Sequence, residues 1–251
     1  MTPSAPDAEF AHPRLAAIYD ALDPDRSDLL PYVAMARELG AHRVLDVGCG
    51  TGVFALLLTD AGFAVTGVDP AGESLAVARA KPGGERVRWL HGGATALAGS
   101  APAPAAEPFD LATMTANVAQ AIDDPAEWDD TLRAVHRVLR PGGHLVFETR
   151  DPARRAWLDW TREATHAVTE VAGVGPVEHW VEVVEVALPL VSFRASWVFP
   201  DGELLTSNST LRFRDRAEIE ESLLGHGYRV VEVRDAPDRP GRELVFLARR
   251  Q

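Results

Sequence analysis

Short apolar runs alternate with segments of helical periodicity between residues 43 and 149. The runs predict strands at 43–47, 63–68, 86–90, 109–114 and 144–149, with helices at 53–58 and 73–80 between them. The best-marked helix begins after Asp124, which suits the N-cap, and carries Pro125 at its first position. Pro141-Gly142-Gly143 is expected to end it, and a loop is expected to begin at 101–104. Such alternation indicates right-handed βαβ units on a parallel sheet.

The period changes to two between residues 164 and 214. Apolar residues at 191, 193, 195, 197 and 199 alternate with mostly polar neighbours, and a Pro-Asp-Gly turn follows at 200–202. This pattern predicts an antiparallel insertion of roughly three or four strands. A helix capped by Asp215 and ending at Gly225 comes next, and strands at 228–233 and 244–248 are expected to close the sheet as an antiparallel pair.

Together these elements predict an α/β fold with a doubly wound, mostly parallel, seven-stranded Rossmann-like sheet and an antiparallel β insertion after strand five. One or two helices are expected in 13–39. The chain is therefore divided into an N-terminal helical cap (1–40), an α/β core (41–150), an insertion that serves as a lid (151–214) and a C-terminal helix and strand pair (215–251).

Composition narrows the classes of partner. The formal net charge of −12 opposes a nucleic-acid backbone, so no nucleic-acid partner is expected. No stretch approaches the ~20 apolar residues that span a bilayer, and the first residues lack the basic and apolar run of a signal peptide. Cys49 is the only cysteine, which rules out a disulfide within the chain and favours the cytoplasm. The eight histidines show no ligand spacing, so no metal is expected.

A glycine-rich loop follows the strand at 43–47 and precedes a helix. Gly48, Gly50 and Gly52 allow a ligand to approach the backbone closely. The dinucleotide fingerprint instead needs a glycine where this chain has Val53. Asp46, just before the loop, would oppose a pyrophosphate but suits a cationic ligand such as S-adenosylmethionine (SAM). A carboxylate at the end of the next strand, Asp69, suits a ribose diol in either case, so a nicotinamide-dependent oxidoreductase remains an alternative.

Four segments resemble class I SAM-dependent methyltransferases in order and spacing: 45–52, 68–70, 109–117 and 139–145. The resemblance covers about residues 40–150 and implies a methyltransferase with SAM as cofactor. The cofactor-binding residues that it implies are Tyr19, Asp46, Gly48, Cys49, Gly50, Asp69, Pro70, Ala94, Thr95 and Thr115. Tyr19 has an equal alternative as an ordinary core residue. The family often has an acid for the adenine amino group where this chain has Gly93.

The acceptor site is expected where the parallel strands end, since ligands gather at that edge of an open α/β sheet. The candidates are Asn117, Glu148, Arg150 and Trp157, and each of the last three has an alternative as a structural residue. No catalytic base is identified; His91 is a candidate with a structural alternative. A small-molecule acceptor is expected, with the insertion covering it or joining two subunits of a homodimer. A non-catalytic SAM-binding module is the other alternative.

Overall fold

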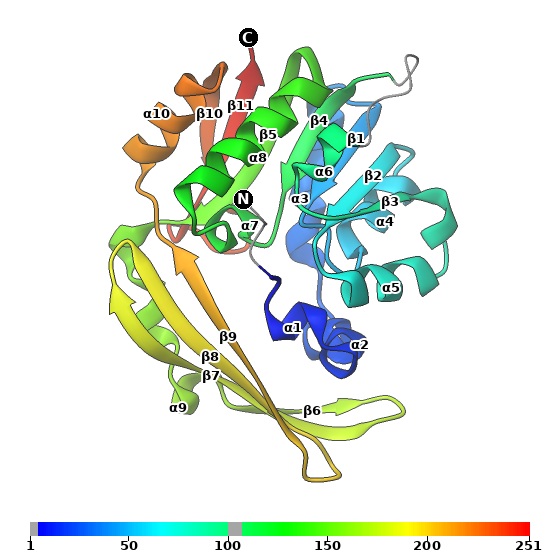
Figure 1. Ribbon diagram of the computed structural model, residues 1–251, viewed down its shortest axis with the longest axis vertical. Coiled ribbons are helices and arrows are strands. Elements are labelled where there is room, and N and C mark those ends of the chain that lie inside the picture. The colour runs from blue at the N-terminus through cyan, green and yellow to red at the C-terminus, as the bar shows by residue number, and fades with distance from the viewer. Residues whose placement is uncertain (1–4, 100–106) are drawn as a thin grey trace.

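The computed structural model describes residues 5–99 and 107–251. A seven-stranded sheet runs through the larger part of the molecule, in the order β10-β11-β5-β4-β1-β2-β3 (Figure 1). β11 is antiparallel to both of its neighbours, whereas β5, β4, β1, β2 and β3 pair in parallel. The bounds are β1 (Arg43–Val47), β2 (Ala64–Asp69), β3 (Arg88–His91), β4 (Phe109–Met114), β5 (Leu139–Arg150), β10 (Tyr228–Asp235) and β11 (Glu243–Arg250). The predicted fold class and the closing strand pair are confirmed.

Helices cover both faces of this sheet because each presents an apolar stripe to it. On one face, Trp128 and Leu132 of α8 and Leu223 of α10 are buried in one core cluster. On the other, Val33 of α3 and Phe54 of α4 belong to a second cluster. The helices are α3 (Leu30–Glu38), α4 (Val53–Asp60), α5 (Gly72–Ala80), α6 (Ala96–Gly99), α7 (Val118–Ala121), α8 (Pro125–Val138) and α10 (Arg216–Gly225). Single 3-10 turns lie at Ser27–Leu29, Gly84–Arg86, Pro152–Arg154 and Ala156–Asp159.

Capping residues set the helix starts where the sequence predicts them. The Asp124 side chain accepts hydrogen bonds from the N–H groups of Ala126 and Glu127, at 2.7 and 3.0 Å. Asp215 does the same for α10, accepting from Glu218 N at 2.8 Å. These bonds satisfy N–H groups that have no partner within the helix.

The boundary between α8 and β5 differs most from the prediction, whereas the other strands shift by two residues at most. The helix α8 ends at Val138, and the strand that follows already begins at Leu139, where it pairs with Phe109. The prediction of a strand limited to 144–149 is therefore wrong at its start. The strand passes through Gly143, where a Cβ would lie 3.0 Å from the backbone oxygen of Asp110, so glycine permits this close pairing. The loop expected at 101–104 lies outside the described residues.

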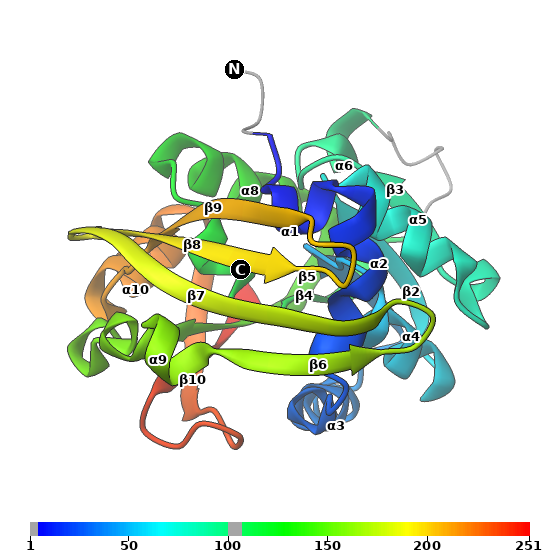
Figure 2. The same ribbon diagram turned by 90° about the horizontal axis from the view of Figure 1, so that it is seen from below.

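Four antiparallel strands form a second sheet, in the order β6-β7-β8-β9. They are β6 (Ala167–Val171), β7 (Gly175–Ala187), β8 (Leu190–Val198) and β9 (Leu204–Arg212), and the short helix α9 (Arg162–Thr165) precedes them. Figure 2 shows this sheet spread across the underside of the molecule, with α1 (Ala8–Ala11) and α2 (Pro13–Leu22) behind it. Leu15 and Ile18 of α2 pack with Val177 and Trp197, so α2 joins the two parts.

No helix in the described ranges is both long and apolar enough to cross a bilayer.

Arg214 attaches the end of the second sheet to the core. It is only 4% exposed. Its guanidinium group donates to the carbonyl oxygens of Ala119 and Ile122 at the end of α7, at 2.8 and 2.7 Å, and lies 4.6 Å over the Trp128 ring. Carbonyls at a helix end lack partners within the helix, so this arginine supplies them.

We expect Arg214→Met to lower the free energy of unfolding by about 1.5–3 kcal/mol, because charged hydrogen bonds are lost from buried carbonyl oxygens. Arg216→Met is the matched control, since Arg216 is exposed and pairs with Glu220 four residues along α10, a contact of small value. Urea denaturation of both variants checks this. Equal losses would contradict the assigned role of Arg214.

Candidate cofactor and acceptor site

The loop after β1 has glycine at three positions, and the surroundings require glycine for different reasons at each. All have positive φ, at +71° for Gly48, +50° for Gly50 and +80° for Gly52. A Cβ on Gly48 would lie 2.5 Å from the Val118 side chain, and one on Gly52 would lie 2.5 Å from the Trp89 ring. A Cβ on Gly50 meets nothing within 4 Å. Packing therefore requires two of the glycines, whereas Gly50 borders open space that a ligand can enter.

Asp69 holds this loop in place. It ends β2 and is 7% exposed. Its Oδ2 accepts from Gly50 N and its Oδ1 from Ala71 N, both at 2.7 Å. Burial raises the pKa of the carboxyl group above its usual value. Each oxygen retains a lone pair after these bonds, so the group can still accept from two vicinal hydroxyls.

Asp46 lies within β1 and is 1% exposed. Its Oδ1 accepts from the Thr113 hydroxyl at 3.1 Å. Burial raises the pKa of Asp46 to about 7, and the hydrogen bond from Thr113 partly opposes this. A buried carboxyl group without a cationic partner favours a bound positive charge nearby.

The segment after β3 leaves open space at Gly93, the position where the sequence departs from the family pattern. A Cβ on Gly93 meets nothing within 4 Å. Ala94 is buried and Thr95 is exposed. The His91 ring instead lies 3.0 Å from the Pro70 carbonyl oxygen, which gives it a structural contact.

The turn after β4 is strained. Ala116 and Asn117 both have left-handed conformations, with φ of 58° and 60°. Residues other than glycine adopt this region at a cost of about 1–3 kcal/mol each, and such strain gathers at functional sites. Glu148 on the neighbouring strand holds the turn, because its Oε1 accepts from Asn117 N at 2.8 Å. Thr115, just before the turn, is buried.

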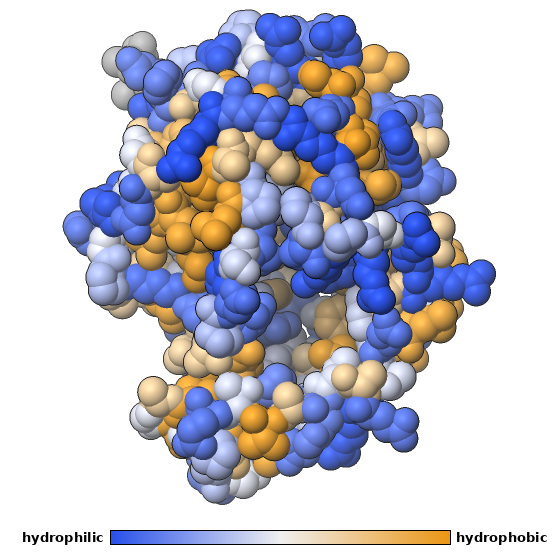
Figure 3. All heavy atoms as spheres, turned by 180° about the vertical axis from the view of Figure 1, so that it is seen from behind, coloured by the Kyte–Doolittle hydropathy of each residue, from blue (hydrophilic) through white to orange (hydrophobic). Residues whose placement is uncertain are grey.

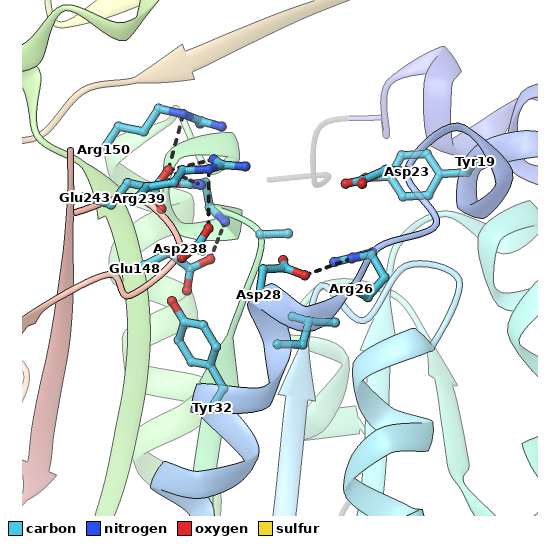
Figure 4. A pocket seen from close by; sticks show the side chains of 13 residues that line it. Tyr19, Asp23, Arg26, Asp28, Tyr32, Glu148, Arg150, Asp238, Arg239 and Glu243 are labelled. Atoms are coloured by element: carbon cyan, nitrogen blue, oxygen red, sulfur yellow. Dashed lines mark hydrogen bonds and ion pairs between the residues drawn. The ribbon is translucent and has the colours of Figure 1, made fainter. Parts of the chain in front are cut away.

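A cavity of about 180 Å³ lies beside this turn. Figure 4 shows it between α2 and α3 on one side and the ends of β4, β5 and β11 on the other. Seen from behind, the molecule is hollowed between the seven-stranded part and the second sheet (Figure 3). The lining residues include five with carboxyl groups and three arginines: Asp23, Asp28, Glu148, Asp238, Glu243, Arg26, Arg150 and Arg239. Tyr19, Tyr32, Leu29, Ala116 and Asn117 complete the lining.

Burial acts on the charges of this cavity. It raises the pKa of Glu148 to about 7, with hydrogen bonds from its surroundings opposing the shift. It also lowers the pKa of Arg150, which Glu243 partly restores. Arg150 lies 3.8 Å from Glu243, and Arg239 donates to the same carboxylate at 2.8 Å. Two guanidinium groups thus share one buried carboxylate.

The N-terminal helix α2 is attached directly to the glycine loop. Asp20 accepts from the Thr51 hydroxyl at 2.6 Å and pairs with Lys81 at 2.5 Å. Lys81 also donates to the Thr51 carbonyl oxygen at 2.7 Å. The adjacent Tyr19 packs against Phe10, with ring centroids 5.6 Å apart, and lines the cavity. Tyr19 therefore faces the site rather than only the core.

Two of the predicted site residues outside the cavity lining, Trp157 and Cys49, are buried in packed surroundings. Trp157 is buried against Phe213, with ring centroids 4.7 Å apart, in a cluster that joins the second sheet to the chain after β5. It serves packing rather than lining the cavity. Cys49 is buried, and burial raises the pKa of its thiol, which makes it a poor nucleophile.

Sequence reasoning missed Tyr32, Glu243, Arg239 and the Asp20–Lys81 pair. Tyr32 shows only helical spacing in the sequence. Arg239 lies between β10 and β11, and Glu243 begins β11. No local signal in the sequence reveals that β11 returns beside β5. In the described ranges, no group of three or more His, Cys, Asp or Glu side chains is placed to hold a metal ion.

Known proteins resemble this chain over its α/β core. Residues 44–143 match the model of a methyltransferase domain. The chain is 33% identical over 128 residues to glycine N-methyltransferase of Rattus norvegicus, covering 47% of this chain and 44% of that protein. It is 34% identical over 131 residues to ubiquinone biosynthesis O-methyltransferase of Aromatoleum aromaticum, covering 51% and 53%. These matches support the predicted resemblance of this part of the chain to class I SAM-dependent methyltransferases.

The chain also has the fold of solved methyltransferases. The sugar N-methyltransferase KedS8 from Streptoalloteichus sp superposes with a TM-score of 0.72 at 20% identity, covering 94% of this chain and 92% of the other. The CcbJ methyltransferase from Streptomyces caelestis gives the same TM-score of 0.72 at 21% identity, covering 94% and 96%. The chain spans about half the length of the curated relatives it matches. The methyltransferase match supports SAM as the cofactor over the nicotinamide alternative, and one neighbour of the same fold is described as SAM-bound.

The residues of the loop fit this cofactor. The open space at Gly50 admits a ligand against the backbone, and Asp69 beside it offers two acceptor oxygens for a ribose diol. Asp46 and Glu148, both buried carboxyl groups, suit the positive charges of the methionine end. With Gly93 in place of an acid, the adenine amino group has no carboxylate at that position.

We expect Gly50→Ala to weaken binding of S-adenosylhomocysteine at least tenfold, because its Cβ fills the space that the ligand needs. Gly40→Ala is the control, since Gly40 has φ +64° and also meets nothing within 4 Å. Both variants should lose about 1–2 kcal/mol of stability from left-handed strain. Calorimetric titration and urea denaturation together separate the two effects. Unchanged affinity in Gly50→Ala would place the cofactor elsewhere.

The raised pKa of Asp46 predicts a pH-dependent stability. The unfolded chain releases this proton near pH 3.8, whereas the folded protein keeps it to about pH 7. Stability from this group is full below pH 3.8 and is lost as the pH rises to about 7. Asparagine cannot ionise, so Asp46→Asn should gain stability relative to wild type across that window, by more than about 1 kcal/mol.

Urea denaturation of the cofactor-free protein at several pH values measures this difference. Asp110→Asn is the contrast, because hydrogen bonds from Arg140, Arg43 N and His42 N lower the pKa of Asp110 although burial opposes them. Its stability difference from wild type should stay constant over the same window. A flat difference for Asp46→Asn would show that this carboxyl group ionises normally.

Proposed function

We propose that this protein transfers the methyl group of SAM to a small-molecule acceptor held in the cavity beside Glu148. The observation that carries the proposal is the juxtaposition of two features. A glycine loop tied to the Asp69 carboxylate lies near a polar cavity at the carboxyl edge of the sheet. The cavity volume of about 180 Å³ is below the ~300–1,000 Å³ of pockets for drug-sized ligands, which favours a small acceptor.

Methyl transfer by this chain depends mainly on how the cofactor and the acceptor are positioned. Bound SAM supplies an activated methyl group whose leaving group departs as a neutral thioether. Asp69 and the backbone at Gly50 fix the nucleoside, and the strained turn at Ala116 and Asn117 fixes the wall between cofactor and acceptor. Such positioning is worth up to ~7–11 kcal/mol of the barrier in the best intramolecular cases.

The surrounding elements exclude water from the acceptor. The helices α1 and α2 lie between the two parts, and Arg14 of α2 forms ion pairs with Asp201 and Glu203 at the turn that joins β8 and β9. Glu9 N also donates to the Ser207 hydroxyl of β9 at 3.0 Å. The second sheet supplies no residue of the cavity lining, so its proposed part is to hold α1 and α2 in place, and Tyr19 of α2 lines the cavity.

The relatives leave the methylated atom open, because one is named for transfer to nitrogen and another for transfer to oxygen. A non-catalytic SAM-binding module is the competing proposal. It predicts cofactor binding without consumption, whereas a methyltransferase forms S-adenosylhomocysteine when a suitable acceptor is supplied.

We expect Asp69→Ala to weaken SAM binding about tenfold or more, because charged hydrogen bonds worth ~1.5–3 kcal/mol are lost. Asp60→Ala is the matched control, since Asp60 is exposed and pairs only with Arg86 among the ion pairs of the described chain. Calorimetric titration of both variants decides the point. Affinity that survives Asp69→Ala would show that the ribose binds elsewhere.

A further inference from the structure

Gly92 and Gly93 follow β3, but only the first of them has to be glycine. Gly92 has φ +138°, and a Cβ there would lie 2.8 Å from the Ala96 side chain. Gly93 does not have a positive φ, and a Cβ on it would meet nothing within 4 Å. Neither the backbone conformation nor the packing of the described chain therefore requires the side chain to be missing at Gly93.

Gly93 lies close to the carboxylate that is proposed to hold the ribose. Strand β3 is the last strand on its side of the sheet (Figure 1), and His91 at its end lies opposite Asp69 at the end of β2. Gly92 N donates to the Asp69 carbonyl oxygen at 2.9 Å, while the Asp69 side chain accepts from Gly50 N. The segment that contains Gly93 thus borders the cofactor site at the edge of the sheet, on the side of the ribose.

This segment supplies no carboxylate to an amino group on the base. Between Glu85 and Glu107 the sequence has no Asp or Glu. Ala94 and Leu97 are buried in the core, and Thr95 is exposed. The acceptors that remain in this segment are neutral, namely backbone carbonyl oxygens and the Thr95 hydroxyl. Hydrogen bonds to neutral acceptors are roughly half as strong as those to ionised ones.

We infer that the base site of this protein does not select the 6-amino group of adenine, and that Gly93 is the position responsible. The inference rests on SAM as the cofactor, which is part of the proposed function, and it concerns the base rather than the methyl acceptor. Without a carboxylate, a purine that lacks the amino group loses only neutral hydrogen bonds. With open space at Gly93, a purine with a bulkier group at carbon 6 meets no side chain at that position.

Calorimetric titration of the wild-type protein with three ligands tests the base preference. The ligands are S-adenosylhomocysteine, its analogue with hydrogen in place of the 6-amino group, and its analogue with a dimethylamino group there. We expect both analogues to bind within about tenfold of S-adenosylhomocysteine, because only neutral hydrogen bonds are lost. A larger preference for S-adenosylhomocysteine over either analogue overturns the inference. If S-adenosylhomocysteine itself does not bind, the proposed function fails instead, so the two failures are distinguishable.

Gly93→Asp tests the assigned position, because it supplies the carboxylate that this segment lacks. The conformation and the open space at Gly93 allow a side chain to be added without strain. We expect the preference for S-adenosylhomocysteine over the deaminated analogue to rise at least about tenfold relative to wild type, as a charged hydrogen bond is gained. The dimethylamino analogue should bind more weakly than to wild type. Gly93→Asn has nearly the same shape without the charge, so its preference should rise less.

Gly225→Asp is the matched control. Gly225 also lacks a positive φ and has open space around a Cβ, and it ends α10, which packs beside β10 at the opposite edge of the sheet. Its three affinities should equal those of wild type, and thermal melts report whether each variant folds. An unchanged base preference in folded Gly93→Asp that still binds S-adenosylhomocysteine would show that the base lies elsewhere, which overturns the role of Gly93. The wild-type titration does not depend on any variant.

Discussion

The pair of hydrogen bonds that Asp69 accepts is the contact on which the rest of the site depends. Through Gly50 N and Ala71 N, one carboxylate fixes the glycine loop relative to the end of β2. The loop must keep positive φ at three successive glycines, a shape that needs external support. Val118 packs on Gly48, so the same loop also sets the place of the strained turn after β4. The proposed cofactor loop and the proposed wall of the acceptor cavity are therefore positioned together.

The second constraint on the site is electrostatic. Asp46, Glu148 and Glu243 are buried within a small region, and two arginines partly balance them. Bringing such groups together without a ligand costs stability, because burial disfavours their charged forms. That arrangement is typical of sites in which a bound cation completes the charge balance. These acids raise each other's pKa values, and they also favour a cationic ligand over an anionic one at this site.

Much of this was predictable from sequence where a local rule acts. Asp124 and Asp215 start helices because a side-chain oxygen three residues or fewer away serves the free N–H groups. The five parallel strands follow from apolar runs, and the second sheet follows from period-two alternation. Strand β5 begins earlier than predicted. Gly142 and Gly143 were interpreted as helix breakers, but they lie within a strand that already pairs with β4 at Leu139.

Residues set by tertiary contacts were not predictable. Tyr32 reaches Glu148 only because α3 packs across the end of β5, and Glu243 reaches Arg150 only because β11 returns beside it. Trp157 is of a residue type that often lines pockets, but it packs against Phe213, which follows the last strand of the second sheet. The glycine loop was recognisable from its sequence pattern, whereas most of the cavity is assembled by topology.

The contact between Asp20, Thr51 and Lys81 has a kinetic consequence. A single aspartate joins α2 both to the glycine loop and to the only lysine of the chain. Any motion that lifts α2 from the loop must separate both partners at once, so the opening is cooperative rather than gradual. This ion pair is one of several contacts that such a motion must break, and raised ionic strength weakens it by screening.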